Sequence, residues 1–161
     1  MLVLNLMKHV LSAQQFTPKQ LDGIINLTDK IKNRSKTKSG RQQLSAVHQG
    51  SILATLFYEP STRTRLSFES AAQRLGAGLI STENAGEFSS AIKGETIEDT
   101  ISVIDDYADI IVMRHPNVGA ADSAAAVSTV PIINGGDGIT RQQGDDGVFF
   151  IFFCRFSLSD F

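Results

Sequence analysis

Residues 51–65 read Ser-Ile-Leu-Ala-Thr-Leu-Phe-Tyr-Glu-Pro-Ser-Thr-Arg-Thr-Arg, an apolar run followed by a segment rich in hydroxyls and guanidiniums. The almost continuous apolar run over 51–57 predicts a strand buried on both faces, as in a parallel sheet covered by helices. Pro60 ends this strand, and apolar residues at roughly helical spacing up to Leu75 predict a helix over 62–75. The polar segment therefore lies where a buried strand gives way to a helix.

Ser61, Thr62, Arg63 and Thr64 fall at or near the N-terminus of that helix. Free backbone N–H groups and the positive end of the helix dipole favour an anion at such a position. The three hydroxyls add donors, and a guanidinium can hold two phosphate oxygens at once. The segment therefore predicts a phosphate site; a plain N-cap followed by a solvated basic turn is the alternative interpretation.

The rest of the chain up to residue 138 alternates helices with strands. We expect helices over about 18–32, 62–75, 96–107 and 120–128, and strands over 52–57, 78–81, 109–113 and 130–133. This alternation predicts a single α/β domain, an open parallel four-stranded sheet flanked by helices. Segments 59–64, 114–116 and 134–138 each follow a strand, so they should meet at the carboxyl edge, where open α/β sheets bind ligands.

Residues 59–65, Glu-Pro-Ser-Thr-Arg-Thr-Arg, resemble the carbamoyl-phosphate signature of the aspartate and ornithine carbamoyltransferases. The resemblance continues in register at residues 93–96, 99–104, 107–109, 112–116, 119–121 and 134–138. It implies the first half of the carbamoyltransferase fold, with a carbamoyl-phosphate-binding domain over residues 1–138.

The same resemblance implies roles for individual residues. Carbamoyl phosphate would be bound by Ser61, Thr62, Arg63, Thr64 and Arg114, of which Arg63, Thr64 and Arg114 would be catalytic. Arg114 would reach both the phosphate and the carbonyl oxygen, where charge develops as an amine attacks. Taken alone, Arg114 could instead be a strand-end arginine paired with an acid such as Asp109. His115 is expected to shape the turn and is not assigned to catalysis.

Ser89 and Lys93 match a loop that the family lends across a subunit interface to complete the neighbouring active site. The resemblance therefore implies a homotrimer, with carbamoyl phosphate and L-aspartate as substrates. Lys93 and the run 113–116, Met-Arg-His-Pro, resemble the aspartate members of the family, and an ornithine carbamoyltransferase is the alternative. No cofactor is implied, and no clustered His, Cys, Asp and Glu spacing suggests a metal.

Composition and charge are those of an ordinary globular protein, with 42% apolar and 20% charged residues and a formal charge of −2. This balance argues against a nucleic-acid binder, and a basic stretch over 30–41 is interpreted as a solvated loop because it also holds Ser, Thr and Gly. The apolar run at residues 1–11 is too short to span a membrane and does not have the order of a signal peptide. With a single Cys154, these features favour a cytoplasmic protein.

From about residue 139 the sequence departs from the family pattern, and six of its ten phenylalanines fall in residues 148–161. We expect 139–161 to be a non-family tail, aberrant or disordered, and the chain to be a truncated enzyme that lacks the family's aspartate-binding domain. On this interpretation the chain alone is inactive. A non-catalytic fragment that binds carbamoyl phosphate or phosphate is the alternative from another class.

Overall fold

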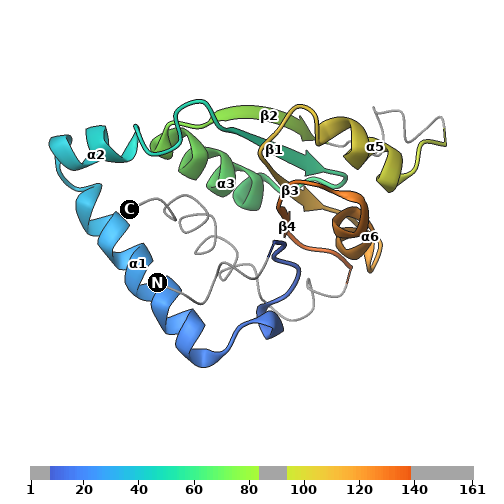
Figure 1. Cartoon of the computed structure of the whole chain (residues 1–161), viewed down its shortest axis with the longest axis horizontal. Coiled ribbons are helices and arrows are strands. Elements are labelled where there is room, and N and C mark those ends of the chain that lie inside the picture. Colours follow the sequence, from blue (N-terminus) through green and yellow to red (C-terminus); the bar gives the residue numbers. More distant parts are fainter. Residues whose placement is uncertain (1–7, 84–93, 139–161) are drawn as a thin grey trace.

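The computed structural model describes residues 8–83 and 94–138, which form a four-stranded parallel sheet with helices on both faces (Figure 1). The strands are β1 (Ile52–Phe57), β2 (Gly78–Glu83), β3 (Ile110–Arg114) and β4 (Ile132–Asn134), in the spatial order β2-β1-β3-β4. The helices are η1 (Ala13–Gln15), α1 (Pro18–Arg34), α2 (Lys38–Leu44), α3 (Thr62–Leu75), α5 (Ile97–Ile104) and α6 (Ala120–Val127). The predicted open parallel sheet is therefore confirmed.

β1 is the central strand because it pairs with β2 on one side and with β3 on the other. Its residues from Leu53 to Phe57 are all buried, as the apolar run predicts. Side chains alternate between the two faces of a strand. Leu53 and Phe57 accordingly enter a cluster with α1, α2 and α3, whereas Ala54 and Leu56 enter a second cluster with α5 and α6. The two helical layers thus cover opposite faces of the sheet.

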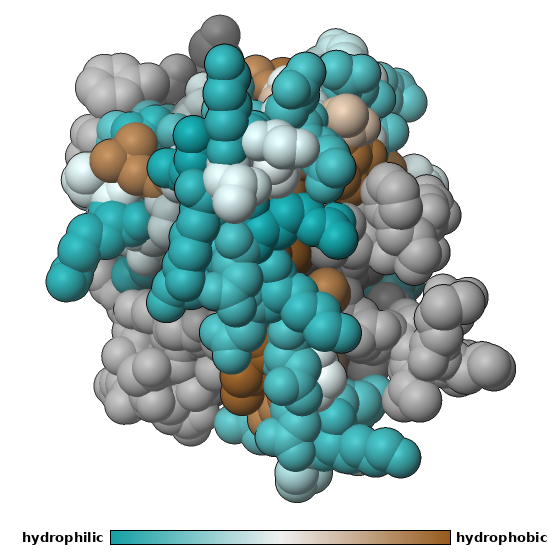
Figure 2. Space-filling view, turned by 90° about the vertical axis from the view of Figure 1, so that its left-hand side faces the viewer, coloured by the Kyte–Doolittle hydropathy of each residue, from teal (hydrophilic) through white to brown (hydrophobic). Residues whose placement is uncertain are grey.

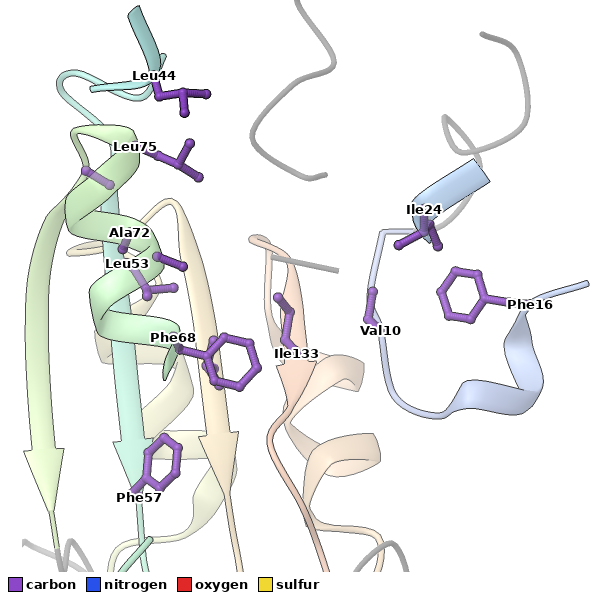
Figure 3. Close-up of a cluster of buried hydrophobic side chains, with 13 residues drawn as sticks. Val10, Phe16, Ile24, Leu44, Leu53, Phe57, Phe68, Ala72, Leu75 and Ile133 are labelled. Carbon is purple, nitrogen blue, oxygen red and sulfur yellow. The ribbon is translucent and has the colours of Figure 1, made fainter. Parts of the chain in front are cut away.

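The first cluster joins segments that are far apart in the sequence (Figure 3). Phe68 on α3 is 1% exposed and packs in the same cluster as Phe57 of β1 and Ile133 of β4. Val10 extends the sheet beyond β4, since its N–H donates to the Ile132 carbonyl oxygen at 2.8 Å and its carbonyl accepts from Asn134 N at 2.9 Å. The N-terminal segment is thereby attached to the edge of the sheet.

One predicted loop is partly wrong. Within the basic stretch 30–41, α1 runs on to Arg34 and the short helix α2 begins at Lys38, where the Thr37 side chain accepts from Gly40 N at 3.0 Å. Gly40 is needed there because a Cβ at that position would lie 2.0 Å from the Arg34 carbonyl oxygen. The cationic side chains themselves are exposed, and the side of the molecule that carries α2 is largely hydrophilic (Figure 2).

Other elements differ from the prediction only at their ends. Strand β2 runs two residues further, to Glu83, and β4 begins two residues later, at Ile132. Helix α5 ends at Ile104 and is followed by a turn, so it is shorter than the predicted 96–107. None of the described helices has the length and apolar content that a membrane span requires. The predicted tail, 139–161, lies outside the described residues.

Phe68 offers a test of the core. We expect Phe68→Ala to lower the free energy of unfolding by about 3–5 kcal/mol, because the side chain is fully buried and its removal leaves a cavity. The matched control is Leu66→Ala on the same helix, where the side chain is 50% exposed and the expected change is within about 0.5 kcal/mol. Urea denaturation measures both, and equal effects would contradict the described packing of α3.

Candidate functional site

The segment between β1 and α3 builds a cationic helix start. Ser61 is the N-cap residue of α3, yet its hydroxyl makes no capping hydrogen bond, which argues against a plain N-cap. Arg65 N donates to the Ser61 carbonyl oxygen at 3.0 Å and closes the first turn, so the N–H groups of Thr62, Arg63 and Thr64 precede the helical ladder. Thr62 and Arg63 are exposed and Thr64 is half-buried.

This first turn contains Arg63 and Arg65 and no acidic residue. Cations at a helix N-terminus are unfavourable because they add to the positive end of the dipole. An anion bound at residues 61–64 would offset that cost, and it would find backbone N–H groups, hydroxyls and a guanidinium within one turn. The charge pattern is therefore that of an anion site.

Arg114 is the last residue of β3, and its side chain is only 8% exposed. Its Nε lies 3.5 Å from Glu59 Oε1 at the end of β1, and its Nη1 donates to the Gly135 carbonyl oxygen at 3.2 Å after β4. Gly136, at φ +120°, packs so closely that a Cβ there would lie 3.1 Å from Nη1. Residues at the ends of three neighbouring strands, β1, β3 and β4, thus surround one guanidinium.

The alternative interpretation of Arg114 as the partner of Asp109 is wrong. Asp109 lies at the opposite end of β3, where its carboxylate accepts from Ile52 N at 2.7 Å. The Arg114 side chain donates from Nη1 to the Gly135 carbonyl oxygen, and its buried Nε makes no hydrogen bond to the described residues. A guanidinium has five N–H donors, so this group suits an anion that supplies further acceptors.

His115 shapes the turn after β3, as the sequence predicts. The backbone N–H of His115 donates to the Gly136 carbonyl oxygen at 3.1 Å, and the ring Nδ1 accepts from Asn117 N at 3.0 Å. The ring centroids of His115 and Tyr58 are 4.6 Å apart. Burial lowers the pKa of His115 below its ordinary value of 6.5, against the opposing effects of Glu59 and Asp137. The lowered pKa favours the neutral imidazole, which its acceptor role at Nδ1 requires.

The turn after β4 is fixed by side-chain hydrogen bonds. Asn134 Oδ1 accepts from Gly136 N at 2.9 Å, and Asp137 Oδ2 accepts from Gly119 N at 3.2 Å at the start of α6. Gly138 is also closely packed, since a Cβ there would lie 2.8 Å from the Pro116 carbonyl oxygen. The turn that contacts Arg114 is thus held by the turn after β3.

The predicted convergence of segments 59–64, 114–116 and 134–138 at the carboxyl edge is what the structure shows, since they follow the adjacent strands β1, β3 and β4. The sequence motif assigns no role to Glu59, which the structure places against Arg114. A carboxylate placed between a buried strand and a proline at the ligand-binding edge is the signal that could have identified it. Ser89 and Lys93 lie outside the described residues.

No group of three or more His, Cys, Asp or Glu side chains in residues 8–83 and 94–138 is arranged to hold a metal ion. The polar groups at the edge are instead a helix start, a buried guanidinium and hydroxyls. These groups bind and polarise an anion without supplying a nucleophile. Fold and site together define an α/β domain in which the carboxyl edge of an open parallel sheet is suited to a phosphate-type anion.

Comparison with known proteins defines this class further. The family described as "Aspartate/ornithine carbamoyltransferase, carbamoyl-P binding domain" matches residues 8–142, and the chain belongs to this family. It is 54% identical over 129 residues to aspartate carbamoyltransferase 1, chloroplastic, of Pisum sativum, covering 80% of this chain and 32% of that protein. It is 48% identical over 131 residues to the aspartate carbamoyltransferase catalytic subunit of Methanocella arvoryzae, covering 81% and 40%.

Solved structures agree. The catalytic subunit of M. jannaschii aspartate transcarbamoylase matches with a TM-score of 0.73 and 47% identity, covering 82% of this chain and 42% of that one. Aspartate transcarbamoylase from Trypanosoma cruzi in complex with carbamoyl phosphate matches with a TM-score of 0.73 and 37% identity, covering 81% and 41%. The chain spans about a third to two-fifths of the length of these relatives.

The protonation of His115 gives a test of the site. Because its pKa in the folded protein is lowered, the unfolded chain binds more protons below the ordinary value of 6.5. We therefore expect the free energy of unfolding to be fully retained above pH 7 and to fall as the pH drops through 6.5. Denaturation at pH 7.5 and 5.5 measures this fall, and His115→Gln should reduce it.

His9 is the internal comparison for that experiment, because burial, aided by Lys8, also lowers its pKa, and its Nδ1 accepts from Ile132 N at 3.1 Å. We expect His9→Gln to reduce the same fall, and the double variant to remove most of it. An NMR titration of His115 with a midpoint at or above 6.5 would contradict the description of its environment.

Proposed function

We propose that this chain binds carbamoyl phosphate at the carboxyl edge of its sheet, through Ser61, Thr62, Arg63, Thr64 and Arg114. The observation that supports this most is the pairing of a cationic helix start with a buried guanidinium whose Nε makes no hydrogen bond to the described residues. Membership of a carbamoyl-phosphate-binding family and the likeness to a relative solved with carbamoyl phosphate support the same ligand.

The residues suit the two halves of this ligand. The phosphate dianion would accept hydrogen bonds from the N–H groups of the first turn of α3 and from the hydroxyls of Ser61, Thr62 and Thr64. It would also accept two from the guanidinium of Arg63. Arg114 would contact the phosphate and the carbonyl oxygen, withdrawing electron density from the carbonyl carbon. In this arrangement Glu59 holds the guanidinium in place by its contact with Nε.

We further propose that the complete family enzyme uses this domain to transfer the carbamoyl group to L-aspartate. The amine nitrogen of aspartate attacks the carbonyl carbon and loses a proton, and the bond from that carbon to the phosphate oxygen breaks. The products are N-carbamoyl-L-aspartate and phosphate, as in pyrimidine synthesis. Arg114 stabilises the negative charge on the carbonyl oxygen in the tetrahedral intermediate, and the helix start stabilises the departing phosphate.

For the chain alone we expect binding without turnover. The residues assigned to the ligand would contact the phosphate or the carbonyl, and none of them is assigned to aspartate. Positioning a second reactant is worth about 7–11 kcal/mol of a reaction barrier, so a chain that binds one substrate alone gains little rate. A non-catalytic module that binds carbamoyl phosphate or phosphate is therefore the second candidate for this chain. The cytoplasmic location of the chain stays a prediction.

The affinity for carbamoyl phosphate tests the assigned residues. We expect calorimetric titration to show saturable binding that Arg63→Ala and Arg114→Ala each weaken about tenfold or more, because each removes charge-assisted hydrogen bonds worth about 1.5–3 kcal/mol. Arg74→Ala, in the last turn of the same helix, is the matched control and should change the affinity by less than twofold.

Two further outcomes separate the candidates. Formation of carbamoyl aspartate by the purified chain would show an active enzyme and contradict the expected absence of turnover. Failure of the folded native chain to bind carbamoyl phosphate would overturn the site itself.

We also propose that the chain assembles as a homotrimer in which Ser89 and Lys93 act in a neighbouring subunit's site. The support is the match of these two residues to the family pattern alone, because both lie outside the described residues. Sedimentation equilibrium should then give a mass near three times the 17.4 kDa of one chain. A monomer at all concentrations tested would refute the assembly and leave the carbamoyl-phosphate site to be judged separately.

A further inference from the structure

A polar network links α3 to the sheet beside the proposed phosphate-binding turn, and none of the roles assigned above uses it. Helix α3 lies against β1 and β2 (Figure 1). At this contact the Oε1 atom of Glu69 accepts from Ser81 Oγ at 2.6 Å and lies 3.0 Å from Thr55 Oγ1. The two hydroxyl oxygens are 3.0 Å from each other. Thr55 is fully buried in the central strand, so one carboxylate joins the helix to two strands.

Arg65 extends this network to the end of β2. Its Nη2 lies 2.8 Å from Glu83 Oε2, and its Nη1 donates to Ser81 Oγ at 3.2 Å. Nη1 also lies 3.7 Å from Glu69 Oε1, one helical turn further along α3. The Arg65 side chain is 21% exposed and that of Glu69 is 15% exposed, so solvent screens their contact less than it screens surface ion pairs. Glu83 is more exposed, at 37%.

The backbone of Arg65 belongs to the turn that carries the proposed ligands. Its N–H closes that turn on the Ser61 carbonyl oxygen at 3.0 Å. The side chain of the same residue is fixed to β2, and its partner Glu69 is fixed to β1 and β2. The first turn of α3 therefore cannot rotate or shift along the sheet without breaking this network.

Such a constraint is necessary because the turn itself is electrostatically unfavourable. It contains two arginines and no acid, and its N-cap hydroxyl makes no capping bond, so local interactions stabilise it poorly. The hydrogen bonds and ion pairs of the network favour one arrangement of α3 on β1 and β2, although Arg65 Nε itself makes no hydrogen bond to the described residues. The carboxylates of Glu69 and Glu83 compensate Arg65 and leave Arg63 as the exposed cation of the turn.

We propose that Glu69 and Arg65 are positioning residues that fix the turn 61–64 in the geometry that binds the phosphate group. This inference rests on the proposed function of that turn. Neither side chain contacts the ligand in this proposal, and both act through the backbone of α3. Arg114, on the other side of the site, is fixed independently by Glu59 and Gly135.

Glu69→Gln distinguishes positioning from electrostatics by the sign of its effect. Removing a negative charge near an anion site strengthens anion binding if charge alone matters. If Glu69 positions the turn, the same substitution weakens anion binding. We then expect the Kd for carbamoyl phosphate to rise at least fivefold. Glu98→Gln on α5 is the matched control and should change the Kd by less than twofold.

Arg65→Lys is the second variant, because it keeps the charge and loses the fork that reaches Glu83 and Ser81 together. We expect it to raise the Kd at least fivefold as well, with Arg74→Lys in the last turn of α3 as its control. A lower melting temperature with an unchanged Kd in both network variants would overturn the proposal. Tighter binding by Glu69→Gln with an unchanged Arg65→Lys would overturn it too.

Hydrogen exchange provides a measurement that does not need the ligand. We expect the amide of Arg65 to exchange at least tenfold faster in Glu69→Gln than in the native chain, while the amide of Leu75 at the other end of α3 keeps its rate. If the native chain does not bind carbamoyl phosphate, the proposed function is wrong, and the exchange rate of Arg65 still decides whether the network fixes the turn. An unchanged rate would overturn the inference.

Discussion

The burial of the Arg114 guanidinium at the carboxyl edge is the constraint on which the rest of the site depends. Glu59, Gly135 and Gly136 approach it from the ends of β1 and β4, so β3 must lie between those two strands. A buried cation is costly unless it is paired and hydrogen-bonded. Arg114 lies beside the Glu59 carboxylate and donates to the Gly135 carbonyl oxygen, and its Nε makes no hydrogen bond to the described residues, which suits a group that a bound anion completes.

The helix start at residues 61–64 meets the same edge from the other side of β1. Its cations and its uncapped N-terminus are unfavourable for α3 alone, and the contacts of Arg65 and Glu69 with the sheet compensate for them. The first turn of α3 is thus unfavourable by its local interactions, and tertiary contacts with the sheet stabilise it. This arrangement is typical of sites in which the protein is preorganised for a charge that the ligand brings.

Much of the fold could be predicted from the sequence because burial and periodicity agree. The apolar run at 52–57 gave the central strand, and the spacing of apolar residues up to Leu75 gave the full length of α3. The helix α2 was missed because its Gly and Ser residues are typical of a loop. What stabilises it is the burial of Leu44 in a cluster with β1 and α3, which is a contact between distant parts of the chain, and Gly40 allows the close local approach to Arg34.

By itself the sequence determined the class of fold, the segment proposed to bind phosphate and the family resemblance, because strand and helix patterns and the motif at 59–65 are local properties of the chain. Only the tertiary structure decided that Arg114 pairs with Glu59 rather than Asp109, and that Arg65 is held by Ser81 and Glu83. Strand order and register determine which side chains meet across a sheet. They depend on packing between residues tens of positions apart, which no local pattern encodes.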